Sequence, residues 1–417
     1  STNMYGPLAD VSGVSYLPEN INGSGINDWY KSDGTDIVGD YGTYGFEGPS
    51  GIVYPAVDGS YNIVAIDQAD SSSTTTYYSV DGVRISVNET NSDGSSVSTE
   101  YNASGGVTKR TDTNTDGSSV ENEYNNTGQR TQKTETDVVG NINVTEYDSS
   151  GIMSKTIASN VDGSGNEVEF NASGGSTKRT DTNADGSSIV NEYDESGDRI
   201  KETTTNTNGT IIVNEYNDAG SPIKYTVINT NGSGLVHEYN DAGDITQKTN
   251  TDSLGNFTVT EYDTPGIISK TIDSNTDGSS IVKEYNDAGD MIKITSTNTD
   301  GTIIVNEYND AGSPIKFTST NTDGSGTEVE YNASGGITKQ TDTNTDGSSV
   351  ANEYNPAGDR IKETTTNTDG SNIVNEYNGA DGALMSETTT ESNGYYAITT
   401  YQGGSILDVK KYDNLDT

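Results

Sequence analysis

Acidic side chains recur along the chain at the spacing of a calcium-binding loop. Residues 112–123, DTNTDGSSVENE, fit the pattern Asp-x-Asn/Asp-x-Asn/Asp-Gly with a Glu six residues after the Gly. Similar matches begin at Asp181, Asp273 and Asp342. Calcium takes oxygen ligands, which Asp and Asn side chains supply. The candidate metal ligands are Asp112, Asn114, Asp116, Asp181, Asn183, Asp185, Asp342, Asn344 and Asp346.

The last position of this pattern argues against a true calcium loop. Such a loop curls its final Glu back to the ion between two helices. Here Glu123 follows Gly117 on a strand-like run, which places it roughly 20 Å away at strand rise, so it cannot share an ion with Asp116. Two interpretations stay open. The pattern is an Asp-Gly hairpin beside a fixed Glu column, or turn oxygens bind calcium alone or between stacked repeats or subunits.

No arrangement of residues points to catalysis. His237 is the only histidine, and it takes a column position that Thr145, Val168 and Asn191 fill elsewhere. The metalloprotease, nucleophile-elbow and phosphate-loop motifs are absent from the sequence. Acid pairs are so common that none stands out as a glycosidase couple. We therefore expect no enzyme, no catalytic residue and no required cofactor, with Ca²⁺ as the one ion that the pattern admits.

The chain repeats itself every 23 residues. From Tyr101 to Tyr377 an aromatic residue recurs in twelve steps of 23, with Phe170 at one of these positions, and the step to Tyr401 is one residue longer. One glycine column lies seven residues before the aromatic residue and another lies four after it. A fixed period of this length is typical of stacked repeat architectures.

Each repeat predicts two strands and two turns. Asp-Gly or Asn-Gly separates extended runs such as 199–205 and 211–216, which are rich in Thr, Ile, Val and Tyr. The fold class predicted from this pattern is all-β, a repetitive β-solenoid or coiled β-sheet of 23-residue two-strand hairpin units with non-repetitive ends. We expect the Tyr column to stack on itself as a thin apolar spine. The predicted boundaries are a cap or assembly module at 1–77, tandem repeats at 78–401, and a cap or docking tail at 402–417.

One repeat, EYDESGDRIKETTTNTNG at 192–209, resembles the YD or Rhs repeat. The matching residues are Tyr193-Asp194, Gly197, Arg199-Ile200, the Thr-rich strand and Gly209. The likeness covers about residues 78 to 401. It implies a secreted or surface protein whose repeats wind into a β-spiral, in some members a cage around a toxin. The family's Arg-Tyr-x-Tyr-Asp pattern is replaced here by Val-x-Glu-Tyr, so the resemblance supports the fold and not encapsulation.

Composition limits the partners. The net charge of −42 repels phosphate, so we expect no nucleic acid. There is no Cys, and no apolar run of eighteen residues that would predict a membrane span. The opening STNMYG lacks an initiator Met, as expected of a processed, exported protein. We therefore expect a secreted protein, extracellular or at the cell surface.

The two ends differ from the repeats and are candidates for assembly. Residues 1–77 hold the only Trp and a Gly-aromatic stretch. The leading hypothesis is a structural protein, the subunit of an extracellular filament or surface fibre whose partner is itself, joined head to tail. The alternatives are an adhesin that binds glycans or a cell surface through residues 1–77, and a fragment of a YD-repeat toxin shell. The candidate assembly residues are Trp29, Tyr30, Tyr44 and Phe46.

Overall fold

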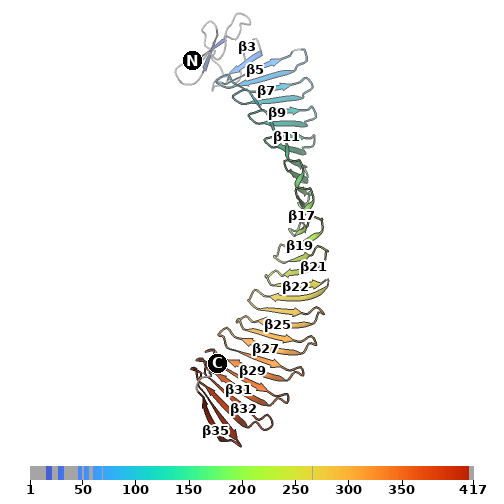
Figure 1. Cartoon of the computed structure of the whole chain (residues 1–417). Coiled ribbons are helices and arrows are strands. Elements are labelled where there is room, and N and C mark those ends of the chain that lie inside the picture. Colours follow the sequence, from blue (N-terminus) through green and yellow to red (C-terminus); the bar gives the residue numbers. More distant parts are fainter. Residues whose placement is uncertain are drawn as a thin grey trace. The chain divides into compact units, whose positions relative to one another are not determined.

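The computed structural model describes residues 16–20, 27–31, 46–48, 51–55, 60–67, 69–264 and 266–412. In these residues β-strands follow one another through tight turns, and there is no helix (Figure 1). Within this same set, no helix is long and apolar enough to cross a membrane. The all-β prediction is confirmed. The chain divides into two compact parts, which we call the first part (residues 1–207) and the second part (residues 208–417).

The first part opens with a two-stranded antiparallel hairpin and continues as a single antiparallel sheet. The hairpin consists of β1 (Tyr16–Asn20) and β2 (Asn27–Lys31). The sheet contains β3 (Phe46–Gly48), β4 (Gly51–Pro55), β5 (Tyr61–Ile66), β6 (Ser73–Tyr78), β7 (Arg84–Thr90), β8 (Ser96–Tyr101), β9 (Val107–Thr113), β10 (Ser119–Tyr124), β11 (Arg130–Thr136), β12 (Ile142–Tyr147), β13 (Met153–Ser159), β14 (Gly165–Phe170), β15 (Ser176–Thr182), β16 (Ser188–Tyr193) and β17 (Arg199–Thr205).

The second part is an antiparallel sheet built in the same way. Its strands are β18 (Ile211–Tyr216), β19 (Pro222–Ile228), β20 (Gly234–Tyr239), β21 (Ile245–Thr251), β22 (Phe257–Thr264), β23 (Ile267–Ser274), β24 (Ser280–Tyr285), β25 (Met291–Thr297), β26 (Ile303–Tyr308), β27 (Pro314–Thr320), β28 (Gly326–Tyr331), β29 (Ile337–Thr343), β30 (Ser349–Tyr354), β31 (Arg360–Thr366), β32 (Asn372–Tyr377), β33 (Leu384–Thr390), β34 (Tyr396–Gln402) and β35 (Ser405–Tyr412).

The predicted two-strand repeat is confirmed. In a typical repeat a seven-residue strand such as β9 is followed by a six-residue strand such as β10, which ends on the recurring aromatic residue. Within each part, strands pair with their neighbours in chain order, so each sheet is an open meander. The strands lie across the sheet one after another (Figure 1). β6 runs through the predicted boundary at residue 77, and β35 lies beyond residue 401 and extends the sheet.

Both turns of a repeat share one backbone form. In the first turn the Gly117 N–H donates to the Asn114 carbonyl at 3.1 Å, and the Asn114 N–H donates to the Ser118 carbonyl at 2.8 Å. The second turn repeats these bonds at Asn125 and Gly128. The two glycines have φ of +88° and +83°. This is a type I turn followed by a left-handed residue, and only Gly adopts that conformation without strain.

One edge of the sheet carries a β-bulge in every repeat. Glu123 pairs with Gln132, but the next residue, Tyr124, pairs with Arg130, which leaves Thr131 as an extra residue. The same shift recurs beside the aromatic residue in later repeats, such as at Glu284/Tyr285 and Glu353/Tyr354. Pairs joined by the first turn, such as β9–β10, show no shift. Bulges increase the local right-handed twist, so each repeat adds twist at the aromatic edge.

The sheets have almost no buried core. Among the described hydrophobic residues only Tyr61 and Val329 are buried. Both faces of the repeats are half-exposed, and no second layer of the described residues covers either one. Stability must therefore come from the backbone hydrogen bonds between strands and from cross-strand side-chain pairs, rather than from a thick apolar interior.

The expected stacking of Tyr on Tyr is replaced by Arg in several repeats. Aromatic residues of successive repeats are separated by a seven-residue strand, because each six-residue strand pairs with seven-residue strands on both sides. The guanidinium of Arg84 lies 4.0 Å from the Tyr101 ring centre, and that of Arg130 lies 4.5 Å from the Tyr147 ring centre. Arg360 lies over Tyr377 at 4.5 Å. The column is thus partly a cation–π column, a favourable contact at a half-exposed site.

The turn glycines allow the cost of left-handed backbone strain to be measured. At Gly347, φ is +86° and an added Cβ would meet no atom within 4 Å, so Gly347→Ala should cost only backbone strain, about 1 to 2 kcal/mol of unfolding free energy. Thr345→Ala, two residues earlier in the same turn, is the matched control and should cost under about 0.5 kcal/mol. Urea unfolding followed by circular dichroism compares them. Equal effects would contradict the strain argument.

Candidate functional site

The two faces of each sheet carry different side chains. Because successive residues of a strand point to opposite faces, the register assigns each column to a face. In β9 and β10, Lys109 pairs with Glu123 on one face, and Arg110 pairs with Asn122 on the other. Tyr124 shares the face of Asn122, two residues away. We call these the Lys–Glu face and the Tyr face.

A ladder of alternating Glu and Lys crosses the Lys–Glu face. From Tyr101 to Tyr377, the Glu before each aromatic residue pairs with a Lys on at least one neighbouring strand, and Glu169 pairs with both Lys155 and Lys178. Gln132 and Gln247 take the Lys position in two repeats. In the first part the ladder runs Glu100, Lys109, Glu123, Gln132, Glu146, Lys155, Glu169, Lys178, Glu192 and Lys201.

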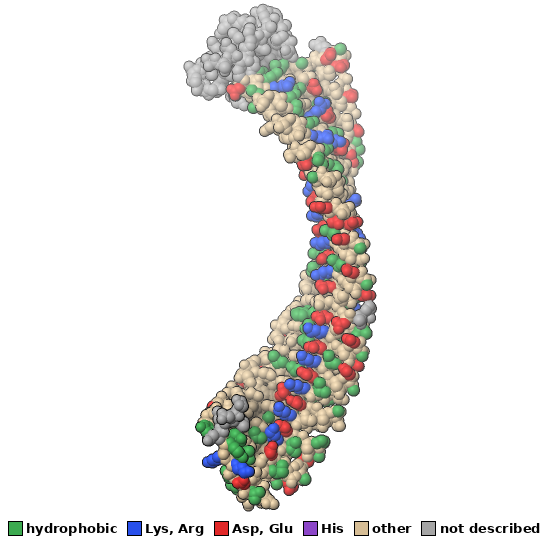
Figure 2. All heavy atoms as spheres, in the orientation of Figure 1, with side chains coloured by type: hydrophobic (Ala, Val, Ile, Leu, Met, Phe, Trp, Pro, Cys, Tyr) green, Lys and Arg blue, Asp and Glu red, His purple; other side chains and the backbone are tan. Residues whose placement is uncertain are grey.

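The second part carries the same ladder. It runs Glu215, Lys224, Glu238, Gln247, Glu261, Lys270, Glu284, Lys293, Glu307, Lys316, Glu330, Lys339, Glu353, Lys362 and Glu376. Figure 2 shows basic and acidic side chains alternating in such a row. The Glu column was visible in the sequence, but its partner was missed. The signal was a Lys eight residues after the aromatic residue, in the same 23-residue phase.

The Lys side chains of the ladder form ion pairs with Glu at one of two positions, the ladder Glu or a Glu two residues before it. A second Glu in a six-residue strand binds one neighbouring Lys, as Glu121 binds Lys109 at 2.8 Å and Glu167 binds Lys155 at 2.7 Å. Lys362 lies beside a strand with Ala351 at that position, and it binds the ladder residue Glu353 directly across at 3.1 Å. The Glu121 carboxylate raises the pKa of Lys109 above its ordinary value through this hydrogen bond.

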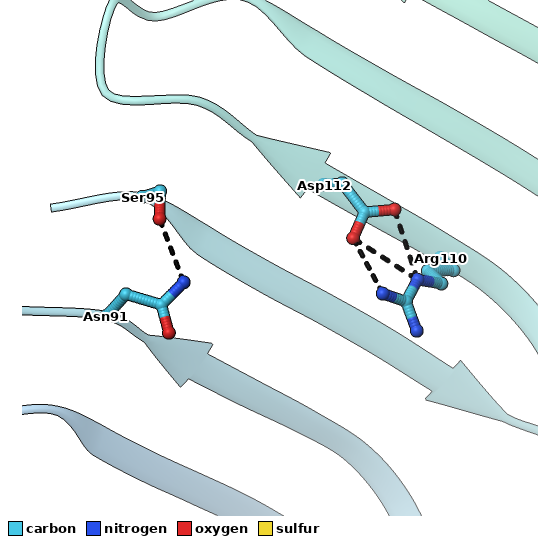
Figure 3. Close-up of polar contacts among 4 residues, drawn as sticks. All are labelled: Asn91, Ser95, Arg110 and Asp112. Atoms are coloured by element: carbon cyan, nitrogen blue, oxygen red, sulfur yellow. Dashed lines mark hydrogen bonds and ion pairs between the residues drawn. The ribbon is translucent and has the colours of Figure 1, made fainter. Parts of the chain in front are cut away.

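The predicted calcium ligands on the strands have partners within the sheet. Asp112 and Arg110 point toward each other from the same strand, with Nη2 and Nε of the arginine donating to the carboxylate at 2.8 and 3.1 Å (Figure 3). Arg179 binds Asp181 in the same way at 2.7 and 2.8 Å. Asp342 accepts from Gln340 Nε2 at 2.9 Å and from the Thr327 hydroxyl at 2.6 Å.

The predicted ligands in the turns also bond locally. Asp116 accepts from the Ser118 hydroxyl at 2.7 Å and from its N–H at 3.0 Å. Asn114 Nδ2 donates to the same hydroxyl at 2.9 Å, and Figure 3 shows the equivalent contact between Asn91 and Ser95. Asn183 with Asp185, and Asn344 with Asp346, repeat this network with Ser187 and Ser348. It closes the first turn of most repeats.

The second turn is closed differently. There the first residue is Asn or Asp, and its Oδ1 accepts the N–H groups two and four residues later. Asn286, for example, accepts from Ala288 at 3.0 Å and from Asp290 at 2.9 Å. Each turn therefore carries a side-chain acceptor for backbone N–H groups that face solvent. These Asn and Asp columns have a structural role that needs no ion.

Within the described ranges, no group of three or more His, Cys, Asp or Glu side chains is placed to hold a metal. The oxygens of the predicted ligands do not converge with a third acid, and calcium binding stays a prediction. His237 pairs across the sheet with Tyr225 and Lys248 on the Tyr face. Burial, and then the charge of Lys248, lower the pKa of His237 from its ordinary value.

The predicted assembly residues lie in the first strands. Tyr30 pairs with Leu17 and Trp29 with Pro18 in the β1–β2 hairpin, and Phe46 pairs with Val53. Tyr44 lies outside the described residues. At the other end, β35 pairs with β34 and with no other described strand. Its Ile406, Leu407 and Val409 are 63%, 66% and 49% exposed, so the last described strand presents apolar side chains to solvent.

Comparisons with known proteins name no family. No family model matches the chain, and no curated protein matches it. Among solved structures, "Crystal Structure of TcdB2-TccC3-TEV" aligns at 11% identity over 84% of this chain and 23% of that one, with a TM-score of 0.15. "Crystal Structure of TcdB2-TccC3" aligns at 11% identity over 97% and 27%, also with a TM-score of 0.15. This chain thus spans about a quarter of the length of the chains it matches, and scores this low carry no argument.

The ladder predicts a specific charge sensitivity. Lys293 pairs with Glu284 and Glu307, so Lys293→Glu should set three acids in a row and cost about 1 kcal/mol of unfolding free energy. Lys293→Gln copies the residue found at Gln132 and Gln247 and should cost under about 0.5 kcal/mol. Urea unfolding at low salt and in 0.5 M NaCl, about a 4 Å screening length, measures both. A charge-reversed variant as stable as Lys293→Gln at low salt would contradict the ladder's role.

The Asp residues of the first turns predict how the free energy of unfolding changes at low pH. The Ser348 hydroxyl, and then its N–H, hold the pKa of Asp346 below its ordinary value of 3.8, and Ser279 and Ser325 act likewise on Asp277 and Asp323. A carboxylate with a lowered pKa stabilises the fold above its ordinary value, and this stabilisation is lost as the pH falls through the folded-state pKa.

The matched variant combines Asp277→Asn, Asp323→Asn and Asp346→Asn. Asn already serves at Asn231, which accepts from the Ser233 hydroxyl at 2.7 Å. The variant should therefore fold, and its stability should fall less steeply than the wild type's between about pH 5 and pH 3. Asp218→Asn, Asp241→Asn and Asp287→Asn together give the same charge change in the other turn. Parallel pH profiles for wild type and the first variant would refute the assignment.

Proposed function

We propose that the protein is a secreted structural subunit whose copies join end to end into an extracellular filament or surface fibre. The observation that carries the proposal is β35, the last described strand, which has one described partner and exposes Ile406, Leu407 and Val409. An uncovered strand edge offers N–H and C=O groups to another chain, and apolar side chains beside it favour burial by that chain.

The repeats support the same proposal. Successive strands pair through the full length of each described sheet, and Glu alternates with Lys along most of the ladder on the Lys–Glu face. Such a sheet grows by adding neighbours, because each repeat contacts only the repeats beside it. We also propose that these repeats are related to the YD or Rhs repeat, because the aromatic, Gly and Thr columns resemble it. Such a relationship is consistent with a secreted fibre.

Head-to-tail joining is the arrangement that we propose. The two ends of the chain differ in sequence, so a heterologous contact between them leaves a free head and a free tail on every growing assembly. A contact of this type extends into an open filament unless its rotation closes a ring. The acidic surface, with a net charge of −42, would keep the subunit soluble before it assembles.

Negative-stain electron microscopy tests the filament proposal. The purified chain should form filaments with a constant axial repeat, examined once with calcium and once with chelator. Filaments that dissolve in chelator would add calcium to the proposal, and filaments in both conditions would remove it. Isolated short particles in both conditions would overturn the proposal. Loss of cell-surface binding on deletion of residues 1–77, with no polymer before or after, would favour the adhesin.

A further inference from the structure

Two pairs of tyrosine rings stack on each other across neighbouring strands. Tyr396 in β34 lies directly opposite Tyr412 in β35, with ring centres 4.7 Å apart and an angle of 13° between the ring planes. Tyr61 in β5 lies opposite Tyr78 in β6 in the same way, at 4.8 Å and 12°. Nearly parallel rings at this separation are in contact over their faces.

The Tyr396–Tyr412 pair lies where a covalent link would matter most. β35 has β34 as its one described partner, and all eight of its residues are exposed. A strand held in this way opens at a lower free energy than a strand inside the sheet. The chain contains no Cys, so a disulfide cannot tie β35 to β34. A covalent link between these strands has to use other side chains.

Two tyrosines in contact can form such a link by oxidation. Removal of one electron and the phenolic proton leaves a radical whose unpaired spin lies partly on the ring carbons beside the C–O bond. Two such carbons join in a new C–C bond, and the displaced ring hydrogens return to the oxygens. In total the two phenols lose two hydrogen atoms and gain one bond. Hydrogen peroxide accepts the two hydrogen atoms and becomes two molecules of water.

We propose that Tyr396 and Tyr412 are a cross-linking site, at which a peroxidase with hydrogen peroxide joins the two rings into dityrosine. The stack holds the two rings together before oxidation, so the second radical forms beside the first. Tyr412 is 38% exposed, whereas Tyr61 is 9% exposed, so the pair in β34 and β35 offers an oxidant the more accessible ring. The bond closes a loop over residues 396–412, and it needs no contact between copies.

A reaction controlled by exposure alone would give a different product. Tyr395 is 46% exposed, more than Tyr412, and lies outside the stack. If exposure decided the reaction, Tyr395 would react first and would form links between copies. The stacked geometry predicts instead a link within one copy, between two strands that are already paired.

Peptide mapping of the oxidised chain tests the site. The purified full-length chain, dilute enough to run as single copies on gel filtration, is treated with peroxidase and hydrogen peroxide, then denatured and digested with trypsin. Cleavage after Lys411 frees residues 412–417, which contain a single tyrosine. The expected product is this peptide joined to residues 363–410, with a mass two hydrogen atoms below the sum of the two peptides. Fragmentation should place the bond at Tyr396.

Two phenylalanine variants separate stacking from exposure. Tyr396→Phe keeps a ring in the stack but lacks the phenol, so the joined peptide should disappear. Tyr395→Phe removes the more exposed phenol and should leave the joined peptide unchanged. Amide hydrogens of β35 should exchange about tenfold more slowly in the oxidised wild type than before oxidation, because the link opposes local opening. Oxidised Tyr396→Phe should show no such protection.

The contrary results are equally specific. Dityrosine that forms mainly between copies, that depends on Tyr395, or that persists at Tyr412 in Tyr396→Phe would overturn the proposal. So would the absence of any joined peptide after oxidation. None of these results bears on the filament, because a chain that polymerises without the link still supports the proposed function. A linked chain that forms no polymer would support the site and overturn the filament.

Discussion

The interior strands of each described sheet are held by their two neighbouring strands and by few other contacts. Both faces of the described repeats are half-exposed, and no second layer of described residues packs against them. Backbone hydrogen bonds alone do not select a register, so the side chains must. The Glu–Lys ladder does this while the face stays polar, since each ladder Glu lies opposite at least one Lys. The β-branched Val, Ile and Thr columns beside the ladder then pack at a fixed spacing.

The two turns secure the register in complementary ways. The first turn uses Asp at its third position and Ser at its fifth, and the second uses Asn or Asp at its first. Both need Gly in the left-handed conformation. A slip of one residue would move every side chain to the opposite face. Such a slip would place the ladder residues on the Tyr face. The side-chain hydrogen bonds of the turns, the turn glycines and the Glu–Lys pairs all disfavour it.

Much of this was predictable, and the failures have identifiable causes. The period from Tyr101 to Tyr377 and the Asp-Gly turns predicted antiparallel hairpins, because both are local signals. The cross-strand partner of Glu123 could not be predicted from its neighbours along the chain, because the pairing with Lys109 depends on the register of the hairpin. The bulge at Tyr124 is also a property of paired strands. Tyr–Tyr stacking was expected from the column alone, before the intervening strand and residues such as Arg130 were placed. The Asp112, Asn114 and Asp116 pattern resembled a metal-binding loop because the same spacing of Asp and Asn before a Gly serves both to bind an ion and to accept hydrogen bonds in a turn.

The repeat that ends at Tyr401 is one residue longer than the others and shows where this architecture tolerates an insertion. The extra residue before Tyr401 falls in the turn, where the Asn378 N–H reaches the Ala383 carbonyl five residues on rather than four, and the strands beside it keep their pairing. Insertions within a strand would invert a face, whereas whole copies of 23 residues leave every column in phase. A gene of this kind can therefore gain or lose repeats by unequal recombination and still encode a foldable chain.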